Sequence, residues 1–271
     1  MLNYAHPGLR ARRALRGFAA TMRISAVIHP ADVPYVAVNV VFQLLQFGVL
    51  ITIWRNLPQD QLGNTAFDVP ALLTYTTVAT AIGPLLNPQT SLSEHIANGT
   101  ITVRMLWPMG IASQFASEML GRILPVMLVT SGVVCGTALL LDVSLVGAGS
   151  LGLFAVSLLL GVAVGLMVDF CFALLTVRLA NGIWFVITIR MACTTIVSGA
   201  LIPFSLMPWH IGDVLQFLPF AAMASGPLLV YTQETGALGV IASQAAWALA
   251  LGLGLMWWSK RLRDKVVGFG G

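Results

Sequence analysis

Two ionisable residues in the middle of long apolar runs carry the most conspicuous chemistry in the sequence. Asp169 and Arg190 lie at nearly equal distances on either side of a short break near residues 179 and 180. With a rise of about 1.5 Å per residue, two antiparallel helices would bring both charges to one level. A charge inside a bilayer is costly and is usually paired or functional. We predict that Asp169 and Arg190 pair, either to lock two helices together or to contact a substrate.

Two further patterns lie inside the apolar runs. Glu118 and Arg122 stand at i, i+4, the spacing at which side chains meet on a helix, and we predict an ion pair between them. Gly161 and Gly165, in GVAVG, offer a face on which another segment can approach closely.

Hydroxyl-bearing residues gather in two other apolar runs. Such hydroxyls either bond to their own helix backbone or line a pathway through the membrane. The polar residues of these runs are Thr74, Thr76, Thr77, Thr80 and Asn87 in one and Thr188, Thr194, Thr195 and Ser198 in the other. Those predicted as possible pathway lining are Thr74, Thr77, Thr80, Thr194 and Ser198.

Signatures of enzymes and nucleotide-binding proteins are missing from the sequence. It lacks G-x-x-x-x-G-K-[ST], H-E-x-x-H, C-x-x-C and G-x-S-x-G, so we predict no catalytic residue and no cofactor bound by this chain. His6, His29, His95 and His210 are scattered, which disfavours a metal site. A membrane-embedded lipid-modifying enzyme would need His, Asp or Glu clustered at one interface, and is a weak alternative.

The composition is typical of an integral membrane protein built of helices. Of the 271 residues, 58% are hydrophobic and only 9% are charged, and the mean hydropathy is +0.88. The apolar runs approach or exceed the length that crosses about 30 Å of hydrocarbon. We predict an all-α fold with six transmembrane helices, at residues 31–54, 70–87, 111–141, 150–177, 183–204 and 237–258.

Lysine and arginine are distributed unevenly between the two sets of span ends. Basic ends stay on the cytoplasmic side. The sequence therefore predicts a multi-pass protein of the cell (inner) membrane with both termini cytoplasmic. It divides into an N-terminal segment (1–30), a transmembrane domain (31–259) and a basic tail (260–271). The basic ends carry Arg10, Arg12, Arg13, Arg16, Arg23, Arg104, Arg178, Lys260, Arg261, Arg263 and Lys265, whereas the opposite ends carry Arg55 alone among basic residues.

Two segments outside the spans have patterns of their own. Residues 9–25 place arginines and apolar side chains on different stripes of a helix, which predicts an amphipathic helix along the inner interface. Residues 203–236 are too short and too interrupted by proline for a crossing, so we predict two short helices that dip in from outside and return. The residues that mark this outer re-entrant hairpin are Pro203, Pro208, Trp209, Pro219 and Pro227.

A polar stretch, SLSEHIANG, separates the second and third predicted spans. Ser91 and Glu94 have the spacing of a capping box, and Gly99 follows as a favoured helix end. Leu92 and Ile96 would be exposed apolar anchors of a short helix that docks in a groove of a partner. An ordinary capped loop helix is the alternative.

In the order of these elements, the chain resembles the membrane subunit of a type-two ATP-binding-cassette exporter that works with a separately encoded ATPase. The stretches that carry the resemblance are IANGTITVRMLWP, LIPFSLMPWHIGDVLQFLPFAAMASGPLLVYT and the terminal GFGG. The resemblance covers nearly the whole chain. It implies that the polar helix, at 91–99, is a coupling helix that docks on a cytosolic ATPase, which binds ATP and Mg in place of this chain. The implied docking residues are Ser91, Leu92, Glu94, His95, Ile96, Asn98 and Gly99.

The predicted function is therefore that of a permease subunit of an ATP-driven exporter, and not of an enzyme. The resemblance further implies a second permease subunit, identical or related, surrounding lipid, and an amphiphilic substrate such as a peptide, antibiotic or lipid; no nucleic-acid partner is expected. The alternative is an ion-coupled secondary transporter in which Asp169 and Arg190 form the coupling site. That class usually shows internal repeats, and the sequence contains no convincing one.

Overall fold

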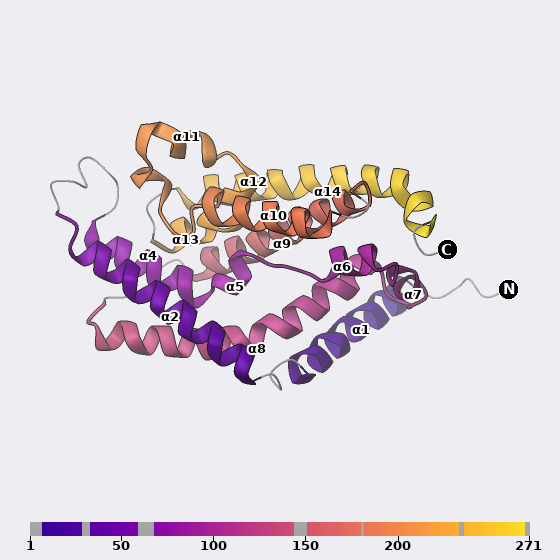
Figure 1. The fold of residues 1–271 in the computed structure, drawn as a ribbon, viewed down its shortest axis with the longest axis horizontal. Helices are drawn as coiled ribbons and strands as arrows, with labels where there is room; N and C mark the ends of the chain where they lie inside the picture. The colour runs from indigo at the N-terminus through magenta and orange to yellow at the C-terminus, as the bar shows by residue number, and fades with distance from the viewer. Residues whose placement is uncertain are drawn as a thin grey trace.

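The computed structural model describes residues 7–28, 33–58, 68–143, 151–179, 182–232 and 236–268, and every regular element within these ranges is a helix. Four helices are long and apolar enough to cross a membrane, and each matches a predicted span. They are α2 (Val33–Arg55), α8 (Ile111–Leu140), α9 (Leu151–Thr176) and α14 (Ala237–Gly268) (Figure 1). The chain is thus a multi-pass, all-α membrane protein.

The other two predicted spans form shorter helices than the sequence indicates. The second is split at Ile82 into α4 (Val69–Ala81) and α5 (Gly83–Leu86), because Pro84 has no N–H to continue the helical hydrogen bonds. The fifth, α10 (Ile183–Val197), ends well before residue 204, the predicted end of the span. Just after α10, Gly199 adopts a left-handed φ of 73°, which does not continue a helix. Six full crossings are therefore not confirmed.

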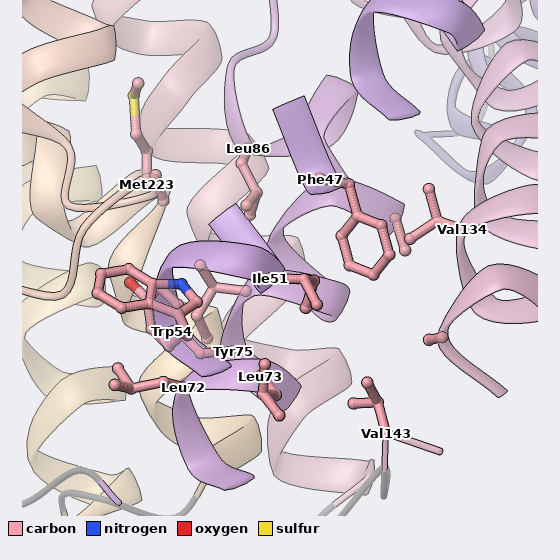
Figure 2. Packing of buried hydrophobic residues seen from close by; sticks show 14 of the residues in the cluster. Phe47, Ile51, Trp54, Leu72, Leu73, Tyr75, Leu86, Val134, Val143 and Met223 are labelled. Atoms are coloured by element: carbon pink, nitrogen blue, oxygen red, sulfur yellow. The ribbon is translucent and has the colours of Figure 1, made fainter. Parts of the chain in front are cut away.

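The main core lies where α2, α4 and α8 meet. Figure 2 shows Phe47 of α2 beside Val134 of α8, and Trp54 grouped with Leu72 and Tyr75 of α4. The polar atoms of the Trp54 and Tyr75 side chains also form hydrogen bonds. Trp54 donates to the Thr76 hydroxyl at 2.9 Å, and the Tyr75 hydroxyl donates to the carbonyl after α10, that of Gly199, at 2.7 Å. These bonds fix α4 to both α2 and α10.

α9 is the central helix, and its small residues allow close packing. It contacts α10, α14, α12 (Pro219–Met223) and α13 (Ser225–Thr232). A Cβ added at Gly161 would lie 2.8 Å from the Met223 carbonyl oxygen, and one at Gly165 would lie 2.5 Å from Cγ of Pro88. Both glycines therefore provide the close-approach face that the sequence predicts.

Residues 203–232 form short helices that start at one end of the molecule and reach into the bundle. Two 3₁₀ turns (Phe204–Leu206 and Pro208–His210) and α11 (Ile211–Leu215) come first, followed by α12 and α13. Pro203 precedes the first turn, Pro208 and Pro219 begin helices, Pro227 lies in the first turn of α13, and Trp209 is 86% exposed. Fully buried Gln244 of α14 donates to the Ala222 carbonyl at 2.8 Å and anchors α12.

The first helix, α1 (Pro7–Ile28), packs along the first half of α8. Figure 1 shows that α8 is bent, and Pro125 lies inside this helix, where a proline favours a kink. Gly121 of α8 makes this contact possible, because a Cβ there would collide with the Met22 carbonyl. Figure 1 shows α6 (Leu92–Ala97), α7 (Ile101–Met105) and the end of α14 at one end of the molecule and α11 at the other. This grouping agrees with the predicted sets of span ends; which end is cytoplasmic stays a prediction.

Candidate functional site

Residues 87–90, which we call the connector, join α5 to α6 and are held by charged side chains from three helices. Asp169 comes from α9, Arg190 from α10 and Arg122 from α8. The close approach of Pro88 to α9 adds a packing contact. The polar helix α6 is therefore joined to the bundle through a built, buried polar site.

Asp169 and Arg190 form the pair that the sequence predicts. Oδ1 of Asp169 lies 3.1 Å from Nε of Arg190, and the two side chains are only 4% and 3% exposed. A buried pair needs additional hydrogen bonds to offset the hydration that both ions lose. Each partner finds these bonds on the connector.

Both ends of the connector are bound by this pair. Oδ2 of Asp169 accepts hydrogen bonds from the Thr90 backbone N–H at 3.0 Å and from the Thr90 hydroxyl. Nη2 of Arg190 donates to the Asn87 side-chain oxygen at 3.1 Å and to the Pro88 carbonyl. The pair therefore fixes α9 and α10 to each other and to the start of α6.

The predicted pair of Glu118 with Arg122 is wrong. Arg122 donates to the Gln89 carbonyl at 2.9 Å, in the middle of the connector, while Glu118 pairs with Arg104 of α7. Both carboxylate oxygens of Glu118 accept from Arg104, the bidentate geometry that suits a guanidinium. The i, i+4 spacing allowed a local pair, but the fold supplies a better partner to each residue.

The short helix α6 has the predicted bounds but a different N-terminal cap. It starts at Leu92, and Gly99 ends it with a left-handed φ of 69°. Ser91 makes no side-chain cap hydrogen bond, so the predicted capping box is absent. The Thr90 hydroxyl instead accepts from the Leu92 N–H at 3.3 Å, and thus serves both α6 and Asp169.

Leu92 and Ile96 are not exposed anchors. Their side chains are 6% and 5% exposed and pack in a second core with Phe115, Ala173 and Val177. The outward residues of this short segment are Glu94, Ala97 and Asn98. His95 is half-buried, with its ring edge against Phe115 and Nε2 3.4 Å from Arg104.

A cavity of about 710 Å³ lies between α2, α4, α5 and α10. Asn87, the first connector residue, is part of its wall. The remaining polar wall residues are neutral amides and hydroxyls, and the apolar ones include Phe42, Leu45, Val49 and Leu86. The cavity can therefore accommodate an apolar tail together with a polar group.

Three of the five hydroxyl residues predicted as pathway lining belong to this wall: Thr80, Thr194 and Ser198. Thr74 and Thr77 do not, because they lie on another face of α4. Thr76, Asn87 and Thr195, which the sequence places among the polar groups of the same two runs, also belong to the wall. The wall residues that no sequence pattern singled out are Gln43 and Gln46 of α2, which a search for amides within apolar spans would have found.

Comparison with known families decides the class of the protein. The model of a family described as ABC-2 family transporter protein matches residues 38–265. The chain belongs to the ABC-2 transporter family. No curated protein and no solved structure gave a match. The ABC-2 protein is thus a membrane permease, the transport component of an ABC transporter, a class that works with an ATPase partner.

Proposed function

We propose that this ABC-2 permease is the membrane subunit of an ATP-driven exporter for an amphiphilic substrate. Two permease subunits, identical or related, form the pathway, and two cytosolic ATPase subunits bind ATP and Mg below them. In this arrangement α6 is the coupling helix, α1 lies along the inner interface, and α12 with α13 is the outer re-entrant hairpin. Peptides, antibiotics and lipids all fit such a pathway.

The connector is the observation that carries this proposal. At its first residue, Asn87 faces the cavity and accepts a hydrogen bond from Arg190. At its last residue, Thr90 is bound by Asp169 and caps α6. A displacement of α6 by an ATPase therefore moves the cavity wall and α10 through a short, buried, hydrogen-bonded path, which is the physical linkage that coupling requires.

A second permease subunit is supported by polar residues on otherwise apolar, outward faces. Gln46 of α2 and Thr195 of α10 belong to the cavity wall and are exposed, and Thr188 of α10 is exposed as well. Polar side chains in membrane spans rarely face lipid and usually face other helices or water. We infer that α2 and α10 face the partner subunit across the pathway.

The geometry of the charged pair disfavours the ion-coupled alternative. Neither Asp169 nor Arg190 belongs to the cavity wall, and both are engaged with each other and with the connector. A coupling carboxylate must be reached by its ion during each cycle. The pair is better suited to transmit force than to bind a transported ion.

Copurification tests the proposal. The tagged permease is isolated from its native membrane and examined for a bound ATPase, and transport is measured in inverted vesicles with ATP, with a non-hydrolysable analogue, and with ionophores. We expect an associated ATPase, and uptake that needs ATP hydrolysis and survives collapse of the ion gradients. Absence of any ATPase, together with gradient-driven uptake in the absence of ATP, would overturn it.

A further inference from the structure

We infer that the cavity between α2, α4, α5 and α10 binds an uncharged amphiphile that carries hydroxyl or amide groups. This inference rests on the proposed function and narrows its substrate class. Three properties of the cavity favour such a ligand: the charges around its wall, its hydrogen-bonding groups and its size.

Among the residues that the structure describes, the wall contains no ionisable one. The Arg190 guanidinium contacts one wall residue, Asn87, and is already paired with Asp169. Its Nη1 has no hydrogen-bond partner in the part of the chain that the structure describes, but this atom is enclosed by protein and Arg190 is not among the wall residues. A charged head group would therefore lose its hydration in the cavity without gaining a counter-ion, which is a large penalty.

The wall does offer neutral hydrogen-bonding groups of both kinds. The Asn87 side-chain oxygen is occupied by Arg190, which leaves its amide N–H groups as donors. Gln46, whose side chain is exposed and belongs to the wall, adds an amide with both a donor and an acceptor. A hydroxyl or an amide can both donate and accept, so either group matches the pair formed by Asn87 and Gln46.

The size and the apolar part of the wall suit an amphiphile. The volume of about 710 Å³ falls within the range of about 300–1,000 Å³ that encloses drug-sized ligands. Phe42, Leu45, Val49 and Leu50 line one flank along α2 and provide contacts for an alkyl chain or ring system. The cavity therefore separates an apolar flank from the polar end at Asn87.

Three surfactants with the same dodecyl tail test the inference: the maltoside, the trimethylammonium and the sulfate, each below its critical micelle concentration. The permease with its partner subunits is placed in nanodiscs as the Thr195→Cys variant, with Cys135, Cys171 and Cys193 replaced by alanine, and the rate of maleimide labelling is measured. We expect the maltoside to slow labelling several-fold and the two charged surfactants to have little effect. Trp209→Cys, exposed and outside the cavity, is the matched control and should be insensitive to all three.

Two further variants make the result specific. Gln46→Leu removes this amide from the wall and should abolish protection by the maltoside, whereas Gln46→Glu places a carboxylate at the same position and should transfer protection to the trimethylammonium surfactant. Equal protection by all three surfactants, none by any, or strongest protection by the sulfate would each overturn the inference. If the maltoside protects but no ATPase accompanies the permease, the proposed function fails while the neutral binding site stands.

Discussion

At the scale of single residues, the protein depends on a few buried polar groups whose partners come from distant parts of the chain. Asp169 is the clearest example, because it receives three contacts from two residues of other segments. The sequence predicted its ion pair with Arg190, since both charges lie at one distance from a turn. It did not reveal Thr90, because the decisive groups there are a backbone N–H and a common hydroxyl.

Replacing Asp169 alone should be far more harmful than replacing the whole pair by apolar residues. Asp169→Asn leaves the Arg190 charge buried without a counter-ion, and we expect a loss of about 3–5 kcal/mol in unfolding free energy. Asp169→Leu combined with Arg190→Met removes both charges, and should be clearly more stable than the single variant. Thermal unfolding of the purified permease in one detergent measures the difference, and a double variant as unstable as Asp169→Asn would contradict this account.

At the scale of elements, α6 shows both what a sequence pattern can reveal and where it fails. Helix bounds followed from local signals, and the glycine end is as predicted. The buried face could not be read, because a helix of six residues has too few turns to distinguish a face that packs inward from one that docks outward. Glu118 pairs with Arg104 rather than Arg122 for a similar reason, because a tertiary ion pair replaces the local i, i+4 pair.

The burial of Leu92 and Ile96 changes what their variants should do. Leu92→Asp or Ile96→Asp would bury a carboxylate in the second core, and we expect loss of folded permease rather than selective loss of the ATPase. Glu94→Arg and Asn98→Arg alter outward side chains and should weaken ATPase association while the permease keeps its thermal stability. Pull-down from detergent extract, with unfolding temperature as the control, measures both.

Intact ATPase association in the Glu94→Arg, Asn98→Arg double variant would place the docking surface away from α6. The nearest exposed alternative is α7 with the residues that follow it, where Val103, Leu106 and Trp107 are largely exposed. Variants there would then become the informative ones.

The connector should determine how efficiently ATP hydrolysis drives transport. In the Asp169→Leu, Arg190→Met variant, α6 can still meet an ATPase but no longer pulls on Asn87 and α10 through the buried pair. We expect the number of substrate molecules moved per ATP hydrolysed to fall several-fold, as measured in proteoliposomes. Thr90→Ser keeps the hydroxyl bound to Asp169 and serves as the matched control; an unchanged ratio in the double variant would show that coupling takes another route.

At the scale of the whole molecule, hydropathy and charge predicted six spans, of which four are full-length helices in the structure, and the division of the chain ends into two sets. They overestimated α4 and α10, because composition does not register the break at Ile82 or the left-handed turn at Gly199. The cavity could be predicted only in part. Its wall combines residues from four helices, and their common face appears only when those helices pack.

Labelling of single cysteines tests the predicted orientation. Asn98→Cys lies beside α6 and Trp209→Cys lies near α11, at opposite ends of the molecule. With a membrane-impermeant maleimide, we expect Asn98→Cys to react in inverted vesicles and Trp209→Cys to react in intact cells, because basic ends stay in the cytoplasm. The reverse pattern would invert the topology, and would place α6 beyond the reach of a cytosolic ATPase.

The way in which the connector is held has a consequence for sequence variation. Arg190 and Arg122 donate hydrogen bonds to the backbone carbonyl oxygens of Pro88 and Gln89, respectively. Every amino acid possesses this carbonyl group. Substitution of Gln89 should therefore be tolerated, whereas one glycine inserted after it would move the carbonyls and Thr90 out of register with three fixed helices. What this part of the protein must preserve is the number of residues between α5 and α6, rather than the identity of Gln89.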